Sequence, residues 1–268
     1  MMMKILAKGT LAAAVVGALL ASTYGCDQPK AKCAAGRGAF AAVYKQVSGP
    51  ASCADLKGEQ VGFGTYNQPG KEGKPNLDVA QIAIQPVGLG NLVDSASAAG
   101  AEDKDPTHKA YSLGFFTTAE PEGDFCTVPS LTVATQSIGA IAEDPENEIP
   151  ASPATTVTYA WSNVKLYVTP SALGTQFTAD LVLTTDNVAC GYKVQGMYPY
   201  VECGKEDPAN PKKSIPDDLD GVARACAPEA DEDAGRPTGS GINPDFPTRC
   251  DPELLTCVLA KDGIPALK

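Results

Sequence analysis

Hydrophobic and polar residues alternate most regularly between residues 163 and 194. The alternation runs through three successive segments, which are separated by short turns at 171–175 and 186–187. A period of two places one set of side chains against a core and the other set in water. Because the connections are short, the three segments are predicted to form an antiparallel meander. Their inward-facing residues are predicted to be Val164, Leu166, Val168, Phe177, Ala179, Leu181, Leu183, Cys190, Tyr192 and Val194.

Shorter alternating runs lie upstream of this meander. They are separated by segments rich in glycine, proline and charged residues, a composition that indicates loops. The sequence therefore predicts an all-β domain at residues 33–203, an antiparallel meander that forms either a barrel or a sandwich. The runs cover residues 61–66, 78–87, 110–118 and 131–135, and the predicted loops cover 67–76, 94–109 and 143–153.

The segment 36–48 fits two patterns. Phe40, Val43, Tyr44 and Val47 follow the spacing of an amphipathic helix, whereas Phe40, Ala42 and Tyr44 also alternate as in a strand. The strand is favoured because the segments that follow are β.

Residues 204–268 differ in composition from the rest of the chain. They hold 9 of the 22 prolines and a single aromatic residue, Phe246. Such a segment has little apolar surface with which to build a core, so disulfides are expected to hold it instead. We predict an irregular, disulfide-stapled C-terminal segment that packs on the β domain.

The N-terminus has the pattern of an export signal. Lys4 and Lys8 precede an apolar run at residues 11–21, which is too short to span a bilayer. The stretch that ends in Gly25 and Cys26 resembles a bacterial lipoprotein signal, and that resemblance implies acylation of Cys26 after cleavage. Residues 1–25 would then be a signal peptide and residues 26–32 a tether to the membrane. The alternative is ordinary signal-peptidase cleavage at the same bond.

The cysteine count supports acylation and indicates a disulfide framework. The chain has nine cysteines, so eight remain for four disulfides if Cys26 carries lipid. The absence of Cys-x-x-Cys argues against a zinc site, and no metal is predicted. Eight cysteines allow 105 connectivities, and sequence alone cannot choose among them. Two pairings are expected because their members are near in sequence, Cys33 with Cys53 and Cys250 with Cys257. The eight disulfide candidates are Cys33, Cys53, Cys126, Cys190, Cys203, Cys226, Cys250 and Cys257.

Charge excludes some partners. The net charge of the whole chain is −11, and removal of Lys4 and Lys8 with the signal leaves 19 basic against 32 acidic residues, a charge of −13. Such a chain repels nucleic acid phosphates and anionic membrane surfaces. No nucleic acid partner is expected, and any membrane contact should depend on the lipid at Cys26.

The sequence lacks the usual catalytic motifs. His108 is the single histidine and is expected to be a solvated surface side chain in a charged loop. Gly-x-Ser-x-Gly, His-Glu-x-x-His and the P-loop pattern are all absent. The acidic run 217–221 lacks the ligand spacing of a calcium loop. We therefore predict no catalytic residue, no cofactor and no enzyme activity.

Five short phrases carry a family resemblance. They are GAFAAVY at 38–44, CADLKGE at 53–59, GTQFTADL at 174–181, MYPY at 197–200 and GRPTGSGINPDF at 235–246. Together they resemble a group of secreted lipoproteins from myxobacteria. The resemblance spans most of the chain after the signal and implies a location in the cell envelope, without implying any catalytic residue.

These observations favour a lipid-anchored envelope protein with a structural or interaction role, whose partner would be an envelope protein or a glycan. Two other functions remain open. The first is a carrier that holds a small apolar ligand inside a β-barrel, which would require an open apolar cavity. The second is a hydrolase that uses two carboxylates facing each other across a cleft.

Overall fold

The computed structural model describes residues 30–143, 151–219, 222–233 and 237–268. By its internal contacts the chain divides into Met1–Lys30 and Ala31–Lys268, and the fold given below is that of the second unit. The predicted signal peptide, Gly25 and Cys26 lie outside the described residues. Among the helices within the described ranges, none is both long enough and apolar enough to cross a membrane.

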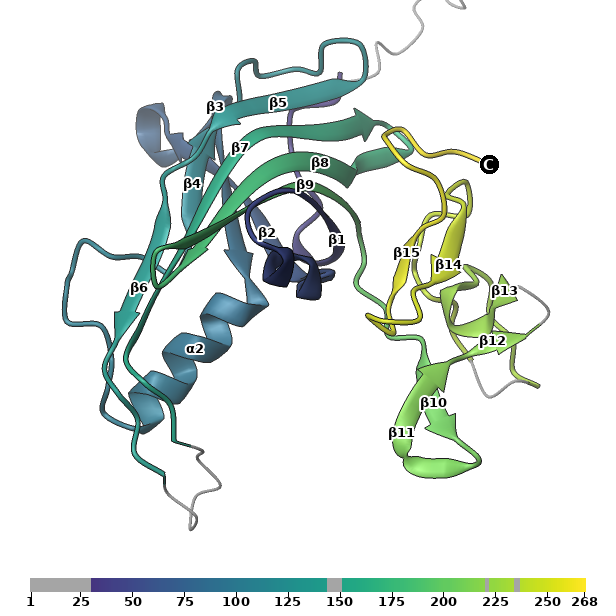
Figure 1. The fold of residues 1–268 in the computed structure, drawn as a ribbon. Helices are drawn as coiled ribbons and strands as arrows, with labels where there is room; N and C mark the ends of the chain where they lie inside the picture. The colour runs from purple at the N-terminus through teal and green to yellow at the C-terminus, as the bar shows by residue number, and fades with distance from the viewer. Residues whose placement is uncertain (1–29, 144–150, 220–221, 234–236) are drawn as a thin grey trace, which may run out of the picture. The chain divides into compact units, whose positions relative to one another are not determined.

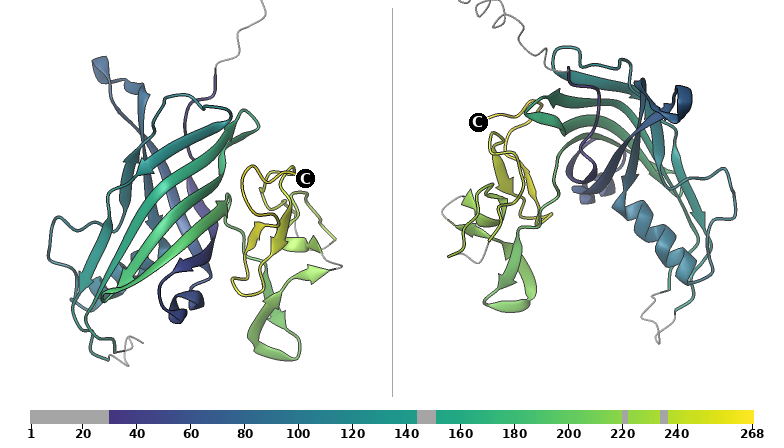
Figure 2. Two further views of the ribbon diagram at one scale, coloured as in Figure 1. Left: turned by 45° about the horizontal axis from the view of Figure 1, so that its top comes forward. Right: turned by 180° about the vertical axis from the view of Figure 1, so that it is seen from behind.

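One curved antiparallel sheet of nine strands dominates the described residues (Figures 1 and 2). Its strand order is β4-β3-β2-β1-β9-β8-β7-β5, and β6 pairs with β7 beyond the end of β5. The first four strands and the last three form two meanders, which β1 and β9 join. The strands are β1 (Gly38–Ser48), β2 (Gly58–Pro69), β3 (Pro75–Pro86), β4 (Ser112–Phe115), β5 (Phe125–Ser130), β6 (Ala134–Ile138), β7 (Thr155–Thr169), β8 (Ala172–Thr185) and β9 (Val188–Met197).

The sheet curves until its two ends nearly meet. Just beyond β4, the backbone N–H of Thr117 donates to the carbonyl of Thr127 in β5. The N–H of Thr132, between β5 and β6, donates to the carbonyl of Leu113 in β4. The all-β prediction is confirmed, and of the two architectures left open the structure has a nearly closed barrel.

The predicted meander corresponds to β7, β8 and β9, and its buried face is largely the one that the alternation indicated. The turn 186–187 connects β8 to β9, with positive φ at both residues. The other turn is shorter than predicted, because β8 already begins at Ala172. Segment 36–48, which fitted two patterns, contains strand β1.

The helix α2 (Val87–Ala98) was not expected from the sequence. Its two glycines and its serines are weak helix formers. Tertiary contacts compensate: the Glu59 carboxylate accepts the Gly88 N–H at 2.8 Å, and Leu89 is fully buried in the main core. The helix extends into the predicted loop 94–109, so that prediction is wrong for its first five residues.

The barrel interior is filled with side chains. Three phenylalanine rings from β1, β2 and β8 meet near one end, with centroids of Phe40 and Phe63 4.5 Å apart and those of Phe63 and Phe177 4.6 Å apart. Towards the other end, Tyr44, Tyr159 and Trp161 occupy the space between β1 and β7. These aromatic side chains are all nearly or fully buried and belong to a single cluster.

The C-terminal segment, residues 204–268, is more regular than predicted. Its described part contains three small two-stranded antiparallel sheets. A second hydrophobic cluster, centred on Ile242 and Phe246, packs this segment against Ala172 of β8 and Met197 of β9. The three sheets are β10 (Gly204–Asp207) with β11 (Asn210–Pro216), β12 (Asp218–Leu219) with β13 (Val222–Ala223), and β14 (Thr248–Cys250) with β15 (Cys257–Leu259).

Candidate functional site

The eight cysteines after residue 30 all lie in disulfides. Two disulfides tie parts of the barrel together across long stretches of sequence, and the other two hold the C-terminal segment. The pairs are Cys33 with Cys126, Cys53 with Cys190, Cys203 with Cys250, and Cys226 with Cys257.

The two pairings expected from closeness in sequence are wrong. Cys33 bonds to Cys126 in β5, and Cys53, in the short helix η1 (Ala51–Asp55), bonds to Cys190 in β9. Cys250 and Cys257 lie opposite each other in β14 and β15, yet each bonds to a cysteine of another segment. Sequence distance misleads here because the fold brings remote segments together.

Three sulfur atoms lie close enough together to resemble a metal site. The Sγ atoms of Cys203, Cys226 and Cys257 lie within 4.8 Å of one another and are buried. All three belong to disulfides, so none is available as the thiolate that binds a metal ion. The arrangement is two disulfides packed side by side.

His108 is not the free surface imidazole that was expected. Its Nδ1 lies 2.6 Å from Oδ2 of Asp103, and the side chain is 30% exposed. Asp103 also accepts a hydrogen bond from the backbone N–H of Ser137, near the end of β6. The pair therefore fastens the loop 99–109 to the sheet.

Glu59 has a partly buried carboxylate that is enclosed by hydrogen-bond donors. Its Oε1 accepts hydrogen bonds from the hydroxyls of Tyr44 at 3.0 Å and Tyr159 at 3.1 Å. Its Oε2 accepts the Gly88 N–H in the first turn of α2, where the helix dipole favours a negative charge. Burial raises the pKa of the Glu59 carboxyl, and the three hydrogen bonds oppose this shift without cancelling it. All polar atoms of the carboxylate are satisfied by the fold, which gives Glu59 a structural role in seating α2.

The raised pKa of Glu59 makes a prediction about stability. A carboxyl whose pKa is higher in the folded state binds more protons there, so its contribution to stability falls as pH rises above the ordinary value near 4.5. Glu59→Gln should remove this slope. The measurement is the free energy of unfolding in urea between pH 4 and pH 8, for both proteins. The comparison uses the pH slope and not the absolute stability, because the variant also loses hydrogen bonds. Both oxygens of the carboxylate accept hydrogen bonds, whereas the glutamine amide has only one oxygen to accept them. Equal pH slopes in the two proteins would contradict the prediction.

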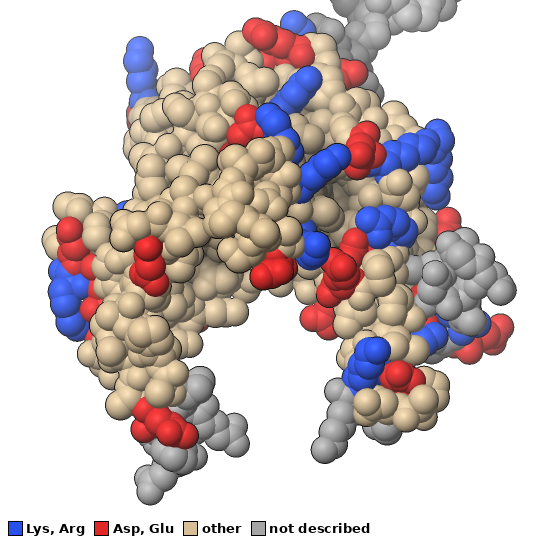
Figure 3. All heavy atoms as spheres, viewed as in Figure 1, with Lys and Arg blue, Asp and Glu red and all other residues tan. Residues whose placement is uncertain are grey.

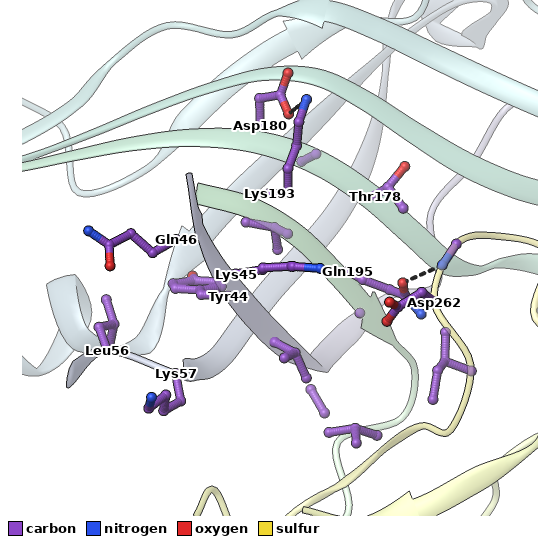
Figure 4. A pocket seen from close by; sticks show the side chains of 18 of the residues that line it. Tyr44, Lys45, Gln46, Leu56, Lys57, Thr178, Asp180, Lys193, Gln195 and Asp262 are labelled. Atoms are coloured by element: carbon purple, nitrogen blue, oxygen red, sulfur yellow. Dashed lines mark hydrogen bonds and ion pairs between the residues drawn. The ribbon is translucent and has the colours of Figure 1, made fainter. Parts of the chain in front are cut away.

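A pocket of the described structure lies on the outer face of the barrel, not inside it. Its volume is about 900 Å³, in the range of small-molecule sites. Strands β1, β9 and β8 form its floor, the residues after η1 form one side, and the C-terminal segment forms the other (Figure 4). We call it the outer pocket.

Strand register arranges the floor of the outer pocket in rows. Side chains on this face alternate with those that fill the barrel. One row across β1, β9 and β8 is Lys45, Lys193 and Asp180; the next is Val43, Gln195 and Thr178. The first row is therefore charged, and the second row is uncharged and includes the apolar side chain of Val43. Further apolar lining comes from Ala41, Ala54, Leu56, Val258 and Leu259.

The charged row contains two lysines side by side. Lys193 forms an ion pair with Asp180 at 2.6 Å, and Asn163 donates to the other oxygen of that carboxylate at 2.8 Å. Partial burial acts to raise the pKa of Asp180, but these two hydrogen bonds outweigh it and hold the pKa below its usual value. Lys45, directly opposite Lys193, makes no ion pair or side-chain hydrogen bond with any other residue that the structure describes.

The C-terminal segment closes the pocket through hydrogen bonds to β9. The side-chain amide of Gln195 donates to the carbonyl of Lys261 and accepts the N–H of Gly263, both at 2.7 Å. Arg249 and Asp262 line this side. Figure 3 shows basic and acidic side chains gathered beside the hollow between the sheet and the C-terminal segment. The pocket could not be predicted from the sequence, because Lys45 and Lys193 become neighbours only when β1 pairs with β9.

The chemistry of the outer pocket suits binding better than hydrolysis. Asp180 and Asp262 are its two carboxylates among the described residues. Asp180 is held in its ionised form by Lys193 and Asn163, which is unsuited to a general acid at neutral pH. The pocket offers cations, amide groups and apolar surface, the kinds of group that bind and position a ligand.

A comparison with known families decides the relationship. The family model MlpA matches residues 38–199, from the start of β1 to just beyond β9. The chain belongs to the MlpA family. This confirms the resemblance to myxobacterial lipoproteins that the five sequence phrases carried.

A known protein of similar sequence agrees with the assignment to the MlpA family. A protein of Myxococcus xanthus described as "Putative lipoprotein MlpA" is 28% identical over 199 residues, which cover 72% of this chain and 69% of that protein. No solved structure matches the chain.

The MlpA region contains the floor and one side of the outer pocket. Lys45, Asp180 and Lys193 lie within residues 38–199, whereas Arg249 and Asp262 lie beyond them. Glu59 and its tyrosine partners also lie inside the matched region.

Proposed function

We propose that the protein is an exported lipoprotein, anchored through Cys26, with a non-enzymatic structural or interaction role in the cell envelope. The observation that carries this proposal is the membership in the MlpA family, together with Gly25 and Cys26 at the end of a short apolar run. The name of the Myxococcus xanthus relative includes the word lipoprotein, which supports the same assignment.

The proposed organisation is a signal peptide at 1–25, a tether at 26–32, a β domain at 33–203 and a C-terminal segment at 204–268. The six residues of the tether after Cys26, 27–32, reach about 20 Å when extended, so the folded part would stay near the bilayer. Four disulfides suit an oxidising compartment outside the cytoplasm. The outer membrane or cell surface is the proposed location.

The role is proposed to be one of interaction. The filled barrel interior gives little support to a carrier that holds its ligand inside the barrel, and the engaged Asp180 gives little support to a carboxylate hydrolase. An envelope protein or glycan remains the proposed macromolecular partner, while a mature charge of −13 argues against nucleic acid.

Acylation of Cys26 is tested by metabolic labelling. Cells that express the chain and are fed labelled palmitate should incorporate label into the wild-type protein, and Cys26→Ala should abolish incorporation because the acceptor thiol is gone. The wild type should also partition with membranes, and the variant should not.

A matched control is Cys33→Ala, which removes a nearby cysteine that bonds to Cys126. It should still take up label. Recovery of a soluble, unacylated wild-type protein that begins at Cys26 would contradict the anchor.

A further inference from the structure

The outer pocket combines apolar lining with an excess of cations. Among the residues that the structure describes, four basic ones line it, Lys45, Lys57, Lys193 and Arg249, against two acids. In the whole chain the balance is the reverse, with 21 basic and 32 acidic residues. The sign of the charge in the pocket is therefore opposite to that of the chain around it.

The neighbouring lysines on the floor lack a full set of counter-charges. Like charges directly opposite on adjacent strands destabilise a sheet. Asp180 neutralises Lys193, and no described residue pairs with Lys45. An anion bound beside Lys45 would relieve the repulsion across the pair.

One of the other cations is held loosely enough to turn towards a ligand. Lys57 lies 3.9 Å from Glu253, and the two side chains are 48% and 63% exposed. Such exposed ion pairs contribute little to stability, so an incoming anion competes with this pair at small cost. Arg249 is held more firmly, because its partner Asp251, at 3.0 Å, is only 13% exposed.

The rest of the lining is apolar. Val43 and Leu56 are partly exposed, and the buried residues Val258 and Leu259 add apolar lining on the C-terminal side. A fully hydrated, polyanionic ligand would leave these surfaces unmatched. A molecule with one anionic group and an apolar chain matches both parts.

We propose that the outer pocket binds a small anionic amphiphile, with its acidic group beside Lys45 and its apolar chain along Val43 and Leu56. The proposal gives the interaction role a ligand, but it does not depend on the lipid at Cys26. Attachment and ligand binding are tested separately.

The test is calorimetric titration of the processed, exported protein with sodium decanoate. The protein is studied in buffer if it is soluble, and in nanodiscs of zwitterionic lipid if it is acylated, with empty nanodiscs as the blank. We expect saturable binding of one decanoate that weakens as salt is raised, because salt screens the charges. Decanol and decyltrimethylammonium, which share the chain but lack the negative charge, should bind more weakly.

Two variants at exposed positions should change the affinity in opposite directions. Lys45→Glu places a negative charge where the proposed cation stands and should weaken binding at least about tenfold, given an interaction of about 1 kcal/mol for each unit of charge at contact in water. Asp262→Asn removes an acid from the lining and should strengthen binding. Lys71→Glu, in the short helix η2 (Lys71–Gly73) away from the pocket, makes the same charge reversal and should leave binding unchanged.

Three outcomes would overturn the proposal. They are the absence of saturable decanoate binding at millimolar concentration, equal binding of decyltrimethylammonium, and equal effects of Lys45→Glu and Lys71→Glu. Circular dichroism of each variant verifies folding, and Lys45→Gln serves as a milder change at the same position. If vesicles of phosphatidylglycerol bind through Lys45 while decanoate does not, the anion belongs to a membrane surface and the small-ligand proposal is wrong.

Discussion

Removal of the two C-terminal disulfides should release residues 204–268 to proteases while the barrel stays folded. The variant replaces Cys203, Cys226, Cys250 and Cys257 by alanine. These bonds span 47 and 31 residues, and chain entropy assigns about 4 kcal/mol to each. The hydrophobic cluster of the segment holds a single aromatic side chain, Phe246, so little remains to replace them.

Some contacts with the barrel would survive that change. Gln176 of β8 exchanges two hydrogen bonds with the backbone of Ala266, and Gln195 holds Lys261 and Gly263. These bonds are too few to keep a segment of this length folded once its covalent links are gone, because each typically contributes about 1 kcal/mol net.

Limited proteolysis followed by mass spectrometry measures the effect. The wild type should resist cleavage after residue 204, and the variant should lose this segment first and leave a protected barrel fragment. The matched control replaces the barrel disulfides, Cys33 with Cys126 and Cys53 with Cys190, which span 93 and 137 residues. That control should destabilise the barrel itself, by about 5 kcal/mol for each bond. Simultaneous degradation of barrel and C-terminal segment in the first variant would contradict the prediction.

The strands that were predicted best are those whose pattern and connections can be read from neighbouring residues in the sequence. In β7, β8 and β9 each inward position is apolar and each connection is short, so alternation alone gives the elements and most of the buried face. The bulge in β7 is an exception. Asn163 has φ of 51°, and the register shifts there, so that Trp161 and Val164 both face the core although they are three residues apart.

Features that depend on remote contacts could not be read from the sequence. Helix α2 has weak intrinsic propensity and depends on Glu59, which lies 29 residues before Gly88. The charged row of the outer pocket depends on the pairing of Lys45 with Lys193. Disulfide partners were mispredicted for the same reason, since closeness in sequence says little once a barrel brings its first and last strands together.

Truncation of Phe177 should be the most damaging single change in the barrel. Phe177 is fully buried, and its ring contacts those of Phe40 and Phe63 at centroid distances of 5.6 and 4.6 Å. Gly196 of β9 leaves room for it, because a Cβ there would lie 2.3 Å from the ring. Phe177→Ala removes these contacts and leaves a cavity in a rigid sheet, at a cost of about 3–5 kcal/mol.

Equilibrium unfolding in urea measures this cost, with circular dichroism as the probe. The matched control is Phe115→Ala in β4, where the side chain is 51% exposed and the expected change is within about 0.5 kcal/mol. The difference between the two variants also tests the carrier function. In a barrel with an open interior there would already be space around Phe177, so Phe177→Ala would lower the free energy of unfolding little more than Phe115→Ala does. A difference of several kcal/mol between the two variants therefore favours a filled barrel, whose binding surface must lie outside, whereas similar small losses would reopen the interior as a ligand site.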